Sequence, residues 1–245
     1  MAQIAKFRSK FVMMYALALA AVFTLSAVNG HAQQTKSNIQ AMSGWQSCST
    51  CAGAGGSGPS APHSMTQYQS SPSLSGKSAK FWLGGSTPYS DALWWKQLGA
   101  ANSLTHHVYD LYFYVKTPQY AQTLEFDSNQ AAVNKKWIYG TQCSIKNHHD
   151  WDVWDTRYAT WRKTGIYCGA PSAYKWHHLT WEFKRDSSKN YFVSFTLDGV
   201  KHYVNKSYYA KTVYANMLDV AFQMDGDSAQ HDYMVWLDKV TLKSW

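Results

Sequence analysis

The most regular signal in the chain is a two-residue alternation of apolar and polar side chains, which recurs in short runs after residue 77. This is the period of a β-strand that buries one face. In one run, Leu124 and Phe126 share a face, and the intervening acidic residues share the other. The runs with this pattern are Val108–Lys116, Thr123–Asp127, Lys136–Cys143, Trp176–Arg185, Tyr191–Leu197, Val200–Asn205, Leu218–Asp225 and Tyr233–Lys243.

Turn signals separate these runs, and no long stretch after the N-terminal region has a helical period. Asp198-Gly199 is a two-residue signal for a β-hairpin between two of the runs. Many short strands with turns between them are typical of an antiparallel β-sandwich or barrel. We therefore predict an all-β domain over residues 77–245.

The alternation also predicts which side chains form the core. The predicted core residues are Leu124, Phe126, Leu179, Trp181, Phe183, Tyr191, Val193, Phe195, Leu197, Leu218, Val220, Phe222 and Met224. The opposite faces are not simply charged, because they carry tryptophan, histidine, glutamine and acidic residues together.

The first 32 residues have the order of a secretory signal peptide. Lys6, Arg8 and Lys10 precede an apolar run over residues 11–28, and Gly30-His31-Ala32 supplies small residues for cleavage. The alternative is a retained membrane anchor, since the run is long enough to span a bilayer. With cleavage we expect a secreted protein that is not attached to the membrane.

Residues 33–76 are rich in Ser, Gly, Gln and Pro, which predicts a linker because such a segment buries little apolar surface. The net charge of +8 falls to +5 without the three basic residues of the leader. The remaining Lys and Arg residues are scattered, so we expect no nucleic-acid partner.

Four cysteines fit an exported protein, in which disulfides are the rule. We predict the pairs Cys143–Cys168 and Cys48–Cys51. The Cys48–Cys51 spacing leaves a redox or metal site as an alternative, although few further metal ligands lie nearby.

The mixed sheet faces indicate a carbohydrate-binding surface, because aromatic rings stack on sugars while polar side chains bind their hydroxyls. The predicted contacts are Asp127, Trp137, Trp154, Trp176, His178 and Gln223. A polysaccharide or other glycan is thus the expected partner. The alternative is a structural envelope or adhesion module in which these aromatic residues are core.

Two further kinds of chemistry depend on carboxylates. Glu125 and Glu182 are the only glutamates in the sequence, and both are predicted to point away from the core, so they could be the acid and base of a glycoside hydrolase. Asp225 and Asp227 flank a turn and could hold a structural calcium ion.

Several motifs resemble known families. The sequence TLEFD at 123–127 resembles the metal-bearing strand of legume lectins and part of the Glu-x-Asp-x-Glu strand of laminarinase-like glycosidases. Ala131, Lys136 and Thr141 stand where the lectin ligands would follow, and Asn129 stands in place of the last glycosidase carboxylate.

A wider resemblance covers residues 77–242 and carries most of the implication for the fold. This part of the chain is similar to secreted bacterial proteins with the concanavalin A-like lectin/glucanase jelly roll. The resemblance implies a concanavalin A-like sandwich here. The motifs are ALWWK at 92–96, LEFD at 124–127, GTQC at 140–143, WDVW at 151–154, WHHLTWE at 176–182, LDG at 197–199, FQMD at 222–225 and VWLD at 235–238.

Overall fold

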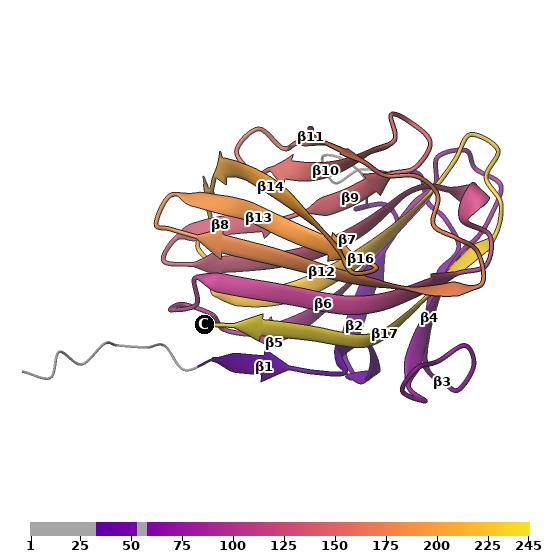
Figure 1. Ribbon diagram of the computed structural model, residues 1–245, viewed down its shortest axis with the longest axis horizontal. Helices are drawn as coiled ribbons and strands as arrows, with labels where there is room; N and C mark the ends of the chain where they lie inside the picture. The colour runs from indigo at the N-terminus through magenta and orange to yellow at the C-terminus, as the bar shows by residue number, and fades with distance from the viewer. Residues whose placement is uncertain (1–32, 53–57) are drawn as a thin grey trace, which may run out of the picture. The chain divides into compact units, whose positions relative to one another are not determined.

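The computed structural model describes residues 33–52 and 58–245, so the predicted signal peptide lies outside the described residues. Two sheets, each antiparallel throughout, pack face to face as a β-sandwich (Figure 1). The predicted fold class is therefore confirmed. Within the described residues, no helix is both long and apolar enough to cross a membrane.

The first sheet has eight strands, and β6 and β17 lie near its middle. In spatial order the main path is β14 (Val200–Tyr209), β13 (Lys189–Leu197), β12 (Lys175–Arg185), β6 (His106–Val115), β17 (Tyr233–Ser244), β4 (Ser78–Leu83) and β3 (His63–Gln69). The short strand β1 (Gln34–Lys36) pairs with the C-terminal half of β17.

The second sheet has nine strands, and β7 and β16 lie at its centre. In spatial order the main path is β11 (Thr160–Tyr167), β10 (Asp150–Asp155), β9 (Thr141–Ser144), β7 (Ala121–Ala132), β16 (Met217–Gly226), β5 (Asp91–Gly99) and β2 (Trp45–Cys48). Beyond β9, β7 also pairs with β8 (Lys135–Tyr139), which pairs with β15 (Lys211–Thr212). Two short 3-10 helices, η1 (Ile39–Ala41) and η2 (Pro118–Tyr120), complete the described elements.

Aromatic side chains join the two sheets across the core. Phe222 on β16 is fully buried, and its ring centroid lies 5.0 Å from that of Phe81 on β4 of the other sheet. On its own sheet it lies 5.4 Å from Phe126 and 6.3 Å from Trp94. Phe222 is therefore a central contact of the core.

A β-bulge changes the predicted faces of β13. The alternation predicts Tyr191 and Val193 in the core, but both are only partly buried, and Phe192 is fully buried instead. The pairing register shifts between Phe192 and Ser194, which inserts one residue and restores Phe195 to the core. On β7, β12 and β16, by contrast, the predicted core residues are buried.

Residues 33–76 differ from the predicted linker, because β1, β2 and β3 add to the two sheets. This segment gains its order from backbone pairing and polar contacts more than from apolar burial. The Gln67 side chain donates to the carbonyl oxygens of Gln40 and Met42, and Ile39 is fully buried. A polar composition alone cannot reveal that the edge of a sheet elsewhere in the fold can pair with such a segment.

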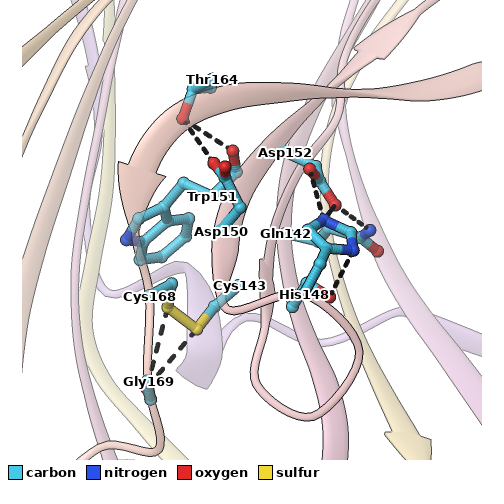
Figure 2. The surroundings of a disulfide bond; sticks show 10 residues. Gln142, Cys143, His148, Asp150, Trp151, Asp152, Thr164, Cys168 and Gly169 are labelled. Atoms are coloured by element: carbon cyan, nitrogen blue, oxygen red, sulfur yellow. Dashed lines mark hydrogen bonds and ion pairs between the residues drawn. A yellow bond between two sulfur atoms is a disulfide. The ribbon is translucent and has the colours of Figure 1, made fainter.

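Both predicted disulfides are confirmed. Cys143 on β9 bonds to Cys168, which follows β11, beside the buried ring of Trp151 (Figure 2). Cys48 at the end of β2 bonds to Cys51. The first of these bonds ties the β10–β11 hairpin back to the body of the second sheet.

Candidate functional site

The outer face of the second sheet is hollowed into a groove of about 330 Å³. An adjoining hollow of about 290 Å³ shares part of its lining and extends it over β5 and β16. We call the two together the groove. Its lining includes Glu125, Asp127, Asn129, Lys136, Trp154, Trp161, Lys211, Asp219 and Gln223.

Strand pairing places the polar side chains on the groove floor. Residues of β7 and β16 that lie opposite each other share a face, and Glu125 is paired with Gln223. The next outward pair along the strands is Asp127 with Ala221. Because Ala221 has a short side chain, room remains above this pair, between taller side chains.

Two tryptophans form one wall of the groove. Trp154 on β10 is paired with Trp161 on β11, and their ring centroids lie 4.9 Å apart in an edge-to-face arrangement. Both are half-buried, so part of each ring faces the groove. Gly140 lies beneath them, and a Cβ there would come within 2.8 Å of Trp154 Cβ. The absence of a side chain at Gly140 therefore allows Trp154 to pack closely on the backbone.

A hydrogen-bonded cluster of acids lies at one end of the floor. The Gln223 Nε2 group donates to Glu125 Oε1 at 2.8 Å and to Asp225 Oδ1 at 2.9 Å. Burial raises the pKa of Glu125 well above its usual range, and the nearby Asp225 and Asp127 carboxylates raise it further.

The neighbouring carboxyls are shifted in the same direction. Burial raises the pKa of Asp127 to about 8, against the backbone N–H of Thr141 that donates to it at 2.9 Å. Burial raises the pKa of Asp91 to about 7 and those of Asp225 and Asp219 to about 6. Glu125, Asp127, Asp225 and the adjacent Asp91 therefore hold protons that ordinary carboxylates release, and these carboxyls can donate or accept a proton near neutral pH. Asp219 lies further along β16, in the adjoining hollow.

We expect the protein to unfold at a higher temperature at about pH 5 than at about pH 8. The unfolded carboxyls release their protons near pH 4, whereas the groove carboxyls keep theirs to higher pH in the folded state. Stability is therefore gained as the pH falls from about 8 towards 4. A shift of one pKa unit in one group changes the free energy of unfolding by about 1.4 kcal/mol. We therefore expect Tm, measured by thermal circular dichroism, to be at least about 3 °C higher at about pH 5 than at about pH 8.

One buried histidine acts in the opposite direction. Burial lowers the pKa of His107 to about 4, so its contribution to stability is lost as the pH falls below about 6.5. Burial also lowers the pKa of His106, so two histidines oppose five carboxyls with raised pKa values, and the net direction stands. Asp127→Asn should narrow the difference in Tm between the two pH values. A Tm that rises from about pH 5 to about pH 8 would contradict this expectation.

The structure separates the predicted site residues into two groups. Asp127, Trp154 and Gln223 meet in the groove together with Glu125. Trp176 and His178 lie on the outer face of the first sheet, where His178 binds Asp110 and stacks on Tyr112. The single aromatic and acidic face predicted from the sequence is thus two faces on opposite sides of the sandwich.

The predicted pairing of Glu125 with Glu182 is wrong for the same reason. Glu182 is on the outer face of β12, where it binds His106 at 3.0 Å and Ser194 at 3.2 Å. Both glutamates point away from the core, as predicted, but they belong to different sheets with the core between them. They cannot flank one glycosidic bond.

Trp137 is also not a sugar contact in this structure. Its side chain is fully buried, and the Arg185 guanidinium lies 4.3 Å from the centre of its ring. It occupies the core face of β8, while Lys136 and Ile138 on the other face line the groove. Tryptophan is a large aromatic residue that is more often buried than exposed to solvent.

The carboxylates proposed to hold calcium bind different partners. Asp225 binds Thr123 and Gln223 on the sheet face, whereas Asp227 binds Lys146 and the backbone N–H groups of the following turn. Across residues 33–52 and 58–245, no group of three or more His, Cys, Asp or Glu side chains could hold a metal ion. The described residues therefore give no support to calcium at this turn.

The groove is also lined by four residues that were not predicted as contacts from the sequence: Trp161, Asn129, Lys136 and Lys211. Asn129 could have been found, because it continues the alternation of Glu125 and Asp127 along one strand. Trp161 and the lysines could not, because their places depend on which strands pair, and strand pairing is not encoded in local periodicity.

No protein-family model matches the sequence, and no curated protein matches it. Among solved structures, an endo-β-1,4-glucuronan lyase from the fungus Trichoderma reesei has a TM-score of 0.51 and 14% identity over 84% of this chain and 94% of its own. Peanut lectin has a TM-score of 0.48 and 9% identity over 87% of this chain and 98% of its own. The likeness to the lyase, with a TM-score above 0.5, concerns the fold alone, which is an antiparallel β-sandwich of two sheets.

Proposed function

We propose that this chain is an exported glycan-binding protein and that a polysaccharide binds along the groove of the second sheet. The observation that carries the proposal is the meeting of Trp154 and Trp161 with Glu125, Asp127 and Gln223 in one open groove. The two disulfides support export, because such bonds persist in oxidising compartments.

The groove offers both kinds of contact that a sugar requires. The tryptophan rings supply apolar surface for the faces of sugar rings. The carboxyls and amides on the floor supply donors and acceptors for hydroxyl groups. The glucuronan lyase with the same fold acts on a polysaccharide, which supports a polysaccharide as the ligand here.

Replacing Trp154 with alanine should weaken glycan binding by about tenfold to thirtyfold, because central aromatic contacts carry much of the free energy of binding. The wild-type chain is first screened on a polysaccharide array, and the affinity for the retained glycan is then measured by isothermal titration calorimetry. Trp154→Phe, which keeps an aromatic ring, should restore part of the loss.

Trp176 provides the matched control, since it is a half-buried tryptophan on the opposite face of the sandwich. Trp176→Ala should bind the glycan as the wild type does. The proposal fails if the array retains no polysaccharide, or if Trp176→Ala abolishes binding while Trp154→Ala does not.

One observation favours cleavage of the bound glycan as a second candidate function. Glu125 and Asp127 stand two residues apart on one strand face, which corresponds to roughly 6.6 Å along the strand. Inverting glycosidases place their two carboxyls about 6.5–9.5 Å apart, and one of them must carry a proton. Glu125, with its raised pKa, suits the acid, whereas Asp127, whose pKa is raised to about 8, can act as the base only above about that pH, so cleavage is assayed at about pH 8–9. Release of reducing ends from the glycan identified on the array would distinguish cleavage from binding alone.

A further inference from the structure

Two lysines lie directly opposite each other in the groove. Lys136 on β8 is the pairing partner of Lys211 on β15, and both side chains line the groove. Like charges placed opposite each other in an antiparallel pair destabilise that pair. This arrangement therefore favours an external group of opposite charge.

Within the part of the chain that the structure describes, neither lysine has a carboxylate within ion-pair distance. Asp219 shares the adjoining hollow with Lys136, but its hydrogen bonds go to Asn129 at 2.8 Å and to Gln97 at 3.4 Å. Asp127 also lines both hollows, and it accepts from the backbone N–H of Thr141. Burial raises the pKa of Asp219, and the charge of Lys136 lowers it in part from beyond ion-pair distance, so neither lysine has an ion-pair partner among the described residues.

The lysines stand at the opposite end of the groove from the acid cluster. Lys136 is paired with Ala131 of β7, which is six residues beyond Glu125 on the same strand. Six residues of strand correspond to roughly 20 Å. A ligand can therefore place a negative group beside the lysines and keep it away from Glu125 and Asp225.

We infer that the Lys136–Lys211 end of the groove binds an anionic group on the glycan, so that the ligand is an acidic polysaccharide. The inference rests on the proposed function, because it names the class of glycan that the same groove takes. A uronate carboxylate and a sulfate ester share the required chemistry, since lysine binds either as a point charge. The positive net charge of the sequence is consistent with an acidic partner.

The test compares three oligosaccharides of equal length and linkage in the calorimeter: a neutral β-1,4-glucan, its uronate form and its sulfated form. The wild-type chain should bind at least one anionic form about tenfold more tightly than the neutral parent, and added salt should reduce this ratio. The two anionic arms show whether carboxylate or sulfate is preferred.

The double variant Lys136→Gln and Lys211→Gln should bring the ratio of anionic to neutral affinity close to one. Lys135→Gln is the matched control, because Lys135 is the neighbouring residue of β8 and is paired with Thr212, so it belongs to the other face of the strand. This control should keep the wild-type ratio.

The outcomes separate the inference from the proposed function. Equal affinity of the wild type for neutral and anionic forms overturns the inference and leaves glycan binding intact. An unchanged ratio in the double variant also overturns it. If none of the three oligosaccharides binds and the polysaccharide array is also blank, the proposed function fails and the inference fails with it.

Discussion

Replacing Phe222 with alanine is expected to lower the free energy of unfolding by about 3–5 kcal/mol. The side chain is fully buried between the sheets, and its ring contacts Phe81, Trp94 and Phe126. Truncation removes these contacts and leaves a cavity that the rigid sheets can only partly fill. The loss is measured by guanidinium unfolding followed through tryptophan fluorescence.

The same substitution should also weaken glycan binding in the groove, because Phe222 precedes Gln223 on β16 and fixes the position of this central strand. Tyr203→Ala is the control, since Tyr203 is 67% exposed on β14 and its loss should change stability by no more than about 0.5 kcal/mol. Equal losses in the two variants would show that Phe222 does not have the central packing role assigned to it.

Removing the Cys143–Cys168 disulfide by a double serine substitution is expected to cost about 3.5 kcal/mol. The bond closes a loop of 25 residues in sequence, and the unfolded chain loses more conformational freedom when a longer loop is closed. The loop contains β10 and all of β11, so loss of the disulfide should also loosen the wall formed by Trp154 and Trp161. Chemical unfolding without reductant measures the first effect, and glycan affinity measures the second.

The Cys48–Cys51 disulfide supplies the comparison within the same protein. It spans three residues in sequence, for which the same relation gives only about 1.6 kcal/mol. Serine at both of these positions should therefore cost clearly less than serine at Cys143 and Cys168. A larger loss from the short loop would contradict an account based on loop closure.

Local periodicity was sufficient for the fold class and for the facing of most strands. Leu179, Trp181 and Phe183 are buried on β12, and Leu218, Val220, Phe222 and Met224 are buried on β16, as the alternation predicts. It failed on β13, where a bulge moves Phe192 into the core. A bulge is set by the strands on either side, so a single strand read alone cannot reveal it.

The candidate site was predictable only in part, for a geometric reason. Alternation shows that Glu125, Trp176 and Glu182 point away from the core, but it does not show to which sheet each strand belongs. In a sandwich the two outward faces look in opposite directions. Residues with the same periodicity were therefore assigned to one surface when they occupy two, and Trp176 and His178 lie on the side of the sandwich away from the groove.

The order of the strands also determines how the domain can be completed during synthesis. The centre of the second sheet is β16 and the junction between β6 and β4 in the first sheet is β17, yet both come from the last part of the chain (Figure 1). Until β16 and β17 have been synthesised, both sheets lack a central strand, and the strands synthesised earlier have unpaired edges. Such a strand order prevents either sheet from being completed progressively from the first residue, because both sheets close only when β16 and β17 have joined the strands that precede them in sequence.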